Sequence, residues 1–255
     1  MSRIIKSVLL ALLLVSGIQA QQSPQLLFDE ANTLLENNDF VDAMNIYRQI
    51  ERGEQVSGAL FLNMGIASTQ LDSLGLAKYY FLRASKFEST HDSAMEALEY
   101  VESQFSRQSA TLPKLPWDKA VDWLKDKPSS SGVFFAGFVC ILIAIAFVLM
   151  HWFNIVSLKK PSTVISSFTI TSILIVALAF YVDYVDQRYS EAVIITNEIQ
   201  VKQKADENAD LVSLGYEGYS ITIDHIVSKE VPDWLYIRLG NGQFGWTRKS
   251  GVKIL

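Results

Sequence analysis

Two stretches, VFFAGFVCILIAIAFVLM at residues 133–150 and VISSFTITSILIVALAFYV at residues 164–182, decide the fold class of this chain. They contain no charged residue and are 18 and 19 residues long, which is enough for an α-helix to cross the hydrocarbon core of a bilayer. We predict transmembrane helices at residues 133–155 and 164–185, joined by a cytoplasmic loop at residues 156–163.

The N-terminal residues predict the orientation of these helices. Two basic residues, an 11-residue apolar segment and small residues ending at Ala20 have the pattern of a signal peptide at residues 1–20. The segments that follow it are then translocated, while Lys159 and Lys160 of the short loop stay inside. We therefore expect a bacterial inner (cytoplasmic) membrane protein with both soluble parts in the periplasm.

Composition excludes several function classes. The 255 residues have a net charge of −5, so there is no general excess of positive charge to neutralise phosphates, and nucleic acid is not an expected partner. Cys140 is the only cysteine, which excludes an internal disulfide framework and a four-thiolate metal site. The three histidines fall in separate segments and no phosphate-binding glycine loop is present. We expect no catalytic residue, metal or cofactor, and hence no enzyme.

Residues 21–111 contain a repeat with a period of 34. The same spacing relates four pairs of small or large apolar residues, Ala31 with Gly65, Ala43 with Ala77, Tyr47 with Phe81, and Ile50 with Ala84. This pattern predicts two hairpins of packed helices and resembles the tetratricopeptide repeat. Asp39 is placed to cap the second helix. A third segment, beginning with a capping box at Ser93, predicts a terminal capping helix.

The first helix of each hairpin is expected to line a groove that binds a peptide segment of a partner. The predicted partner-binding residues are Phe28, Asn32, Leu35, Leu62, Asn63 and Ile66. The two asparagines are candidates for hydrogen bonds to an extended chain. The alternative is that Leu62 and Ile66 are simply packed on a neighbouring helix.

Residues 112–132 form a predicted hinge next to the membrane. Pro113 and Pro116 cannot continue a helix. After them, apolar and charged residues alternate around Trp117 and Trp123, which predicts a short amphipathic helix in contact with membrane lipid.

The C-terminal residues 190–255 have a different character. Short β-rich runs separated by turns predict a small barrel of five or six strands. Asn241-Gly242 is the signal for a two-residue hairpin with a type I′ turn.

Three aromatic residues in this segment, with Asn241-Gly242 and Glu217-Gly218, resemble a bacterial SH3-type domain. Its candidate ligand platform consists of Trp234, Tyr236 and Trp246. The alternative is that these side chains form the core of the barrel, since aromatic residues in so small a barrel are commonly buried. The sequence leaves open whether the domain binds a protein, peptidoglycan or nothing.

The order of these parts resembles the BatE family of the bacterial aerotolerance operon. The fold class expected is a multidomain membrane protein with an all-α helical repeat, two transmembrane helices and a small all-β barrel. The resemblance implies an outward-facing interaction scaffold in an envelope complex, with von Willebrand-type membrane proteins as partners and a link to oxidative-stress tolerance. An envelope stress sensor and a cell-wall-binding anchor are the alternatives.

Overall fold

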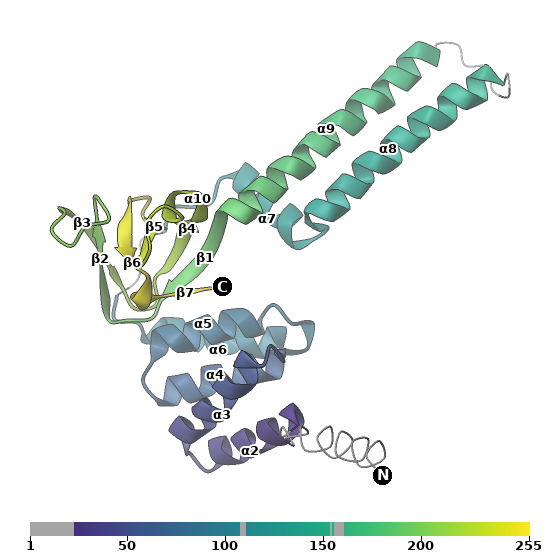
Figure 1. Ribbon diagram of the computed structural model, residues 1–255. Helices are drawn as coiled ribbons and strands as arrows, with labels where there is room; N and C mark the ends of the chain where they lie inside the picture. The colour runs from purple at the N-terminus through teal and green to yellow at the C-terminus, as the bar shows by residue number, and fades with distance from the viewer. Residues whose placement is uncertain (1–22, 108–110, 154, 156–160) are drawn as a thin grey trace, which may run out of the picture. The chain divides into compact units, whose positions relative to one another are not determined.

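The computed structural model describes residues 23–107, 111–153, 155 and 161–255 (Figure 1). The predicted signal peptide and most of the predicted cytoplasmic loop, with Lys159 and Lys160, lie outside the described residues. The chain divides into two compact units, with the boundary between Ser106 and Arg107. We refer to residues 23–106 as the helical unit and to residues 189–255, within the second unit, as the β-module.

The helical unit consists of helical hairpins (Figure 1). Helix α2 packs against α3 and α4 against α5, while α6 packs against α5. The bounds are α2 (Pro24–Glu36), α3 (Phe40–Arg52), α4 (Gly58–Gln70), α5 (Leu74–Ala84), the 3-10 helix η1 (Glu88–Thr90) and α6 (His91–Gln104).

Helix starts and turns repeat with the period found in the sequence. Ser23 and Ser57, 34 residues apart, cap α2 and α4, each accepting a hydrogen bond on its side chain from the backbone N–H three residues later. Asn38 and Asp72, also 34 residues apart, have the left-handed backbone of the turns inside each hairpin, with φ of 65° and 54°. Asparagine and aspartate tolerate this conformation better than other non-glycine residues.

The residue pairs that the 34-residue spacing predicted lie in the core of the helical unit. Tyr47 and Phe81 are 0% and 2% exposed, and the small residues of the pairs are buried beside them. A Cβ atom on Gly65 would lie 2.4 Å from Cε1 of Phe81. Position 65 therefore has no room for a side chain, because the Phe81 ring packs directly on the backbone of α4.

Two predicted caps are wrong in detail. Helix α6 begins at His91 after Thr90, so Ser93 lies in its first turn and the predicted capping box does not mark the helix start. Asp39 does precede α3, but its side chain makes no capping hydrogen bond. In both places the preceding backbone already turns into the helix, at η1 before α6 and at the Asn38 turn before α3.

The second unit begins with three helices, one before the two apolar stretches and one over each of them. These are α7 (Pro116–Asp126), α8 (Ser129–Trp152) and α9 (Pro161–Arg188). Helices α8 and α9 pack together, and both are long and apolar enough to cross a membrane. Large apolar side chains such as Phe135 and Leu174, each 65% exposed, point away from the pair. This composition is compatible with a membrane protein, because such side chains are stable in lipid.

Close contact between α8 and α9 depends on two small residues. Ser172 Oγ donates a hydrogen bond to the Gly137 carbonyl across the pair, at 2.8 Å. Serine and threonine in a helix commonly bond to carbonyls of their own helix, as Ser166 and Thr169 do here. Ser172 differs because it faces Gly137, where α9 approaches the backbone of α8 closely.

The β-module is a seven-stranded antiparallel sheet with strand order β3-β2-β6-β5-β4-β1-β7. The strands are β1 (Tyr189–Ile194), β2 (Glu198–Lys202), β3 (Leu211–Tyr216), β4 (Ser220–Asp224), β5 (Trp234–Leu239), β6 (Phe244–Arg248) and β7 (Val252–Ile254), with a short helix α10 (His225–Ser228) after β4 and a 3-10 helix η2 (Lys249–Gly251) after β6. The expected five or six strands become seven because β3 and the short β7 carry weak sequence signals.

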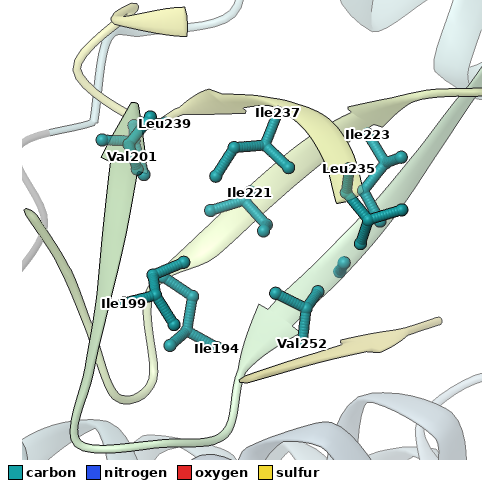
Figure 2. Close-up of a cluster of buried hydrophobic side chains, with 10 residues drawn as sticks. Ile194, Ile199, Val201, Ile221, Ile223, Leu235, Ile237, Leu239 and Val252 are labelled. Carbon is teal, nitrogen blue, oxygen red and sulfur yellow. The ribbon is translucent and has the colours of Figure 1, made fainter. Parts of the chain in front are cut away.

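The sheet curls around one apolar cluster (Figure 2). Ile199 and Val201 of β2 share this cluster with Val252 of β7, although β2 and β7 are far apart in the strand order. The sheet must therefore bend to bring them together. Along β5, Leu235, Ile237 and Leu239 face the cluster and the alternate residues face outward.

The hairpin between β5 and β6 is where predicted, but its turn differs. Leu239 and Gln243 are joined by a backbone hydrogen bond, so the loop has three residues, Gly240, Asn241 and Gly242. Gly242 has a φ of 86°, whereas Asn241 does not have a positive φ. This is the three-residue loop in which the last position requires left-handed backbone, and the predicted type I′ turn is wrong.

Candidate functional site

The six predicted partner-binding residues lie on α2 and α4, which are neighbours in the helical unit. Asn63 Nδ2 donates a hydrogen bond to Asn32 Oδ1 at 2.8 Å, and Tyr47 Oη donates to the same oxygen at 2.7 Å. Burial raises the pKa of Tyr47 to about 12, so its phenol remains a donor at neutral pH. The asparagines thus join the two hairpins, and these two bonds do not involve Asn32 Nδ2 or Asn63 Oδ1.

The apolar members of this set differ in their surroundings. Leu62 packs against the buried cluster of α5 and α6 that contains Phe81 and Leu98, so the packing alternative applies to it. Ile66 is 38% exposed, which makes it the most accessible of the six. Phe28 and Leu35 are half-buried, and the Phe28 ring lies 6.0 Å from that of Tyr47.

Tyr100 is a further candidate for this surface, and sequence reasoning missed it. It lies on α6, which neighbours α4, and it is 58% exposed. Its number is 34 higher than that of Ile66, so continuing the period by one more step would have found it. We call the two asparagines, Leu35, Ile66, Phe28, Leu62 and Tyr100 the inner-helix surface.

A second candidate surface is the outward side of β5 and β6. Three cross-strand pairs follow one another there, Trp234 with Arg248, Tyr236 with Trp246, and Arg238 with Phe244. The guanidinium carbon of Arg248 lies 4.5 Å from the centre of the Trp234 ring, and that of Arg238 lies 5.7 Å from the Phe244 ring. The Tyr236 and Trp246 rings meet edge to face at 5.3 Å. We call these six residues the basic-aromatic face.

The predicted platform residues therefore lie together, and they lie outside the cluster shown in Figure 2. Trp234 is nonetheless only 7% exposed, with Arg248 over its ring, while Tyr236 and Trp246 are half-buried. The alternation of side chains along β5 and β6 accounts for this arrangement, because Leu235 and Ile237 take the core positions between them.

An open cleft of about 400 Å³ adjoins this face. Lys202 and Arg248 form its cationic end, together with Glu207 from the loop between β2 and β3. Glu207 Oε1 accepts hydrogen bonds from Arg248, whose guanidinium lowers the pKa of this carboxyl below its ordinary value. Glu198 and Gln200, earlier on β2, also line the cleft, and no motif in the sequence pointed to this grouping.

A polar junction joins α9 to the sheet. Arg188, the last residue of α9, donates two hydrogen bonds to Asp224 Oδ2 at 2.9 and 2.7 Å. Asp224 Oδ1 accepts from the backbone of Ile226 and Val227 and so caps α10. Strand β1 begins at Tyr189 directly after α9, so this junction connects an apolar helix to the β-module without a linker.

Comparison with models of known protein families and with curated proteins found no match for this chain. Among the residues that the structure describes, no group of three or more histidine, cysteine, aspartate or glutamate side chains is placed to hold a metal ion.

Proposed function

We propose that this protein is a membrane-anchored, outward-facing scaffold whose inner-helix surface binds a segment of a partner membrane protein. The observation that carries the proposal is the arrangement of α2 and α4. Their half-buried and exposed apolar side chains are held side by side by the bond between Asn32 and Asn63. A preformed apolar surface with a few polar groups is typical of a peptide-binding site.

The order of the parts supports a more specific proposal. Helical hairpins, two apolar helices and a C-terminal antiparallel sheet follow one another as they do in the BatE family that the sequence resembles. Within this proposal the hairpins are tetratricopeptide repeats, the β-module is an SH3-like domain and both face the periplasm. The partners are then membrane proteins with von Willebrand-type domains, in a complex that contributes to oxidative-stress tolerance.

Co-purification from mild detergent tests the scaffold. The full-length protein is compared with Ile66→Glu, which places a charge on the inner-helix surface at a residue outside the buried cluster against which Leu62 packs. Val41→Glu on α3 is the matched control, since Val41 is an apolar residue that is 60% exposed but lies outside this surface. We expect Ile66→Glu to lose the partner membrane proteins and Val41→Glu to keep them.

Equal recovery of partners with both variants would contradict the assignment of the inner-helix surface. Tyr100→Glu extends the test to α6, because Tyr100 is exposed and its replacement leaves the helix buried face unchanged. Loss of partners with this variant as well would show that the surface continues over α6.

An envelope sensor is the second candidate function, and the junction between α9 and the β-module favours it. Because Arg188 binds Asp224, a displacement of the sheet would be transmitted to α9. Replacing the predicted cytoplasmic loop, residues 156–163, by a neutral linker of equal length distinguishes the two functions. A scaffold keeps its function with that linker, whereas a sensor that signals through the loop loses it while its topology stays correct.

A further inference from the structure

We propose that the open cleft of the β-module binds an acidic segment of a partner protein, and that Glu207 occupies the cationic end of the cleft until that segment displaces it. The inner-helix surface belongs to the other unit and has no part in this proposal. The ligand is an Asp or Glu side chain presented on an extended peptide.

The cationic end already holds a carboxylate. Arg248 Nε and Nη2 lie 2.7 and 2.6 Å from Glu207 Oε1, and Lys202 Nζ lies 3.7 Å from Glu207 Oε2. The Lys202 ammonium also donates to the Glu207 backbone carbonyl. The β-module thus displays, with its own loop, how a glutamate side chain fits between these two cations.

Glu207 is a weak occupant. Its side chain is 59% exposed and that of Arg248 is 47% exposed, so the pair is a surface ion pair in contact with water. Such pairs contribute little to stability, and a competing carboxylate exchanges with them easily. The Lys202 side chain, by contrast, is only 9% exposed and is therefore held in place. It can contact the carboxylate of Glu207 or that of the peptide from the same position.

The neighbouring residues give a competing peptide additional contacts. The cleft has the volume of a small ligand site, and Trp234 forms part of its lining. Glu198 lies at the other end, four residues before Lys202 on β2 and hence about 13 Å away. Its negative charge disfavours a second acid at that end, so the cleft suits one acidic side chain in a defined position.

The test uses the full-length protein in detergent and two labelled peptides with amidated C-termini. One has the sequence ADENA of residues 205–209, and the other is the uncharged ANQNA. Fluorescence anisotropy measures binding to the wild type and to Glu207→Gln, Arg248→Gln and Lys249→Gln. The Lys249→Gln variant is the matched control, because this substitution removes one exposed positive charge of the β-module at a position outside the cleft.

We expect Glu207→Gln to bind ADENA about two- to fivefold more tightly than the wild type, since its competitor is gone. Arg248→Gln should lose at least fivefold, Lys249→Gln should match the wild type, and ANQNA should not bind. A misfolded variant cannot imitate the gain with Glu207→Gln. The proposal is overturned if Glu207→Gln does not bind ADENA more tightly than the wild type, or if Lys249→Gln weakens binding as much as Arg248→Gln. It is also overturned if Glu207→Gln is retained better than the wild type on isolated peptidoglycan while its affinity for ADENA is unchanged.

Discussion

At the scale of single residues, Gly65 shows how one missing side chain brings two helices together. The Phe81 ring packs where a Cβ atom would be, with three ring carbons within 2.9 Å of that position. Ala31 occupies the equivalent position of the repeat in the first hairpin, 34 residues earlier. The second hairpin thus has a glycine where the first has an alanine, and the close approach of the Phe81 ring leaves no room for a Cβ atom there.

We predict that Gly65→Ala destabilises the helical unit by about 1–3 kcal/mol, because either α4 or the buried Phe81 ring must move. Higher intrinsic helix propensity of alanine offsets about 1 kcal/mol of the strain. Hydrogen exchange of α4 and α5 amides in urea measures the change. Ala59→Ser, at an exposed position of the same helix, should have a small effect, and equal protection of both variants would contradict the packing explanation.

At the scale of elements, the contact between α8 and α9 depends on Ser172 and Gly137. We predict that Ser172→Ala costs the helix pair about 0.6 kcal/mol, the usual contribution of a hydrogen bond between helices in lipid. Unfolding in mixed micelles measures this cost. Ser166→Ala is the control, since Ser166 bonds only to carbonyls of its own helix and should leave the pair unchanged.

Gly137→Leu tests the same contact by steric means. A Cβ atom at this position would lie 2.8 Å from Val176 Cγ2 and 3.2 Å from the Val176 backbone nitrogen. The leucine should separate the helices and lower stability more than Ser172→Ala does. A Gly137→Leu protein as stable as the wild type would show that the two helices do not approach here.

The junction of α9 with the sheet predicts a pH dependence. Burial alone would raise the pKa of Asp224, but the hydrogen bonds from Arg188 and two backbone N–H groups lower it below its ordinary value of 3.8. A lowered pKa in the folded state means that the ionised carboxylate stabilises the fold above about pH 3.8 and that this contribution is lost as the pH falls through the lowered value.

We therefore predict that Asp224→Asn melts a few degrees below the wild type at pH 7 and that the difference shrinks below pH 3.8. Near-UV circular dichroism of the full-length protein in detergent measures both melting temperatures. The comparison between the two proteins cancels other carboxylates, such as Glu207. A melting-temperature difference that stays constant between pH 7 and pH 3 would show that the charge of Asp224 does not stabilise the fold.

At the scale of the whole molecule, two membrane-crossing helices would place the helical unit and the β-module on the same side of the membrane. We predict that cysteines introduced at Glu54 and Asn241, both exposed, react with an impermeant thiol reagent in intact cells. Cys140 is replaced by alanine beforehand. A cysteine at Ser157 should react only after permeabilisation.

Different outcomes at the two exposed positions would show that α8 and α9 do not both cross the membrane. Protection of both, with Ser157 reactive from outside, would invert the proposed orientation. Glu54 lies in the turn after α3 and Asn241 in the loop between β5 and β6, so labels at these two residues leave the packed interior intact.

Regular patterns along the chain predicted the elements well. The period of 34 located the helical hairpins and their buried residues, because a repeat places equivalent residues in equivalent surroundings, and the β-rich runs of residues 190–255 predicted the sheet. Local turn chemistry was predicted less well. The Asn241-Gly242 turn depends on the register between Leu239 and Gln243, which belongs to two strands and not to the dipeptide.

The sequence by itself thus determined the helical hairpins, the two apolar helices and most of the strands, since these follow from hydrophobic periodicity and length. Only the tertiary structure decided which polar side chains meet. Arg188 and Asp224 are 36 residues apart and Arg248 and Glu207 are 41 apart. Nothing local in the chain encodes such contacts, because they exist only after strand register and curvature have brought distant segments together.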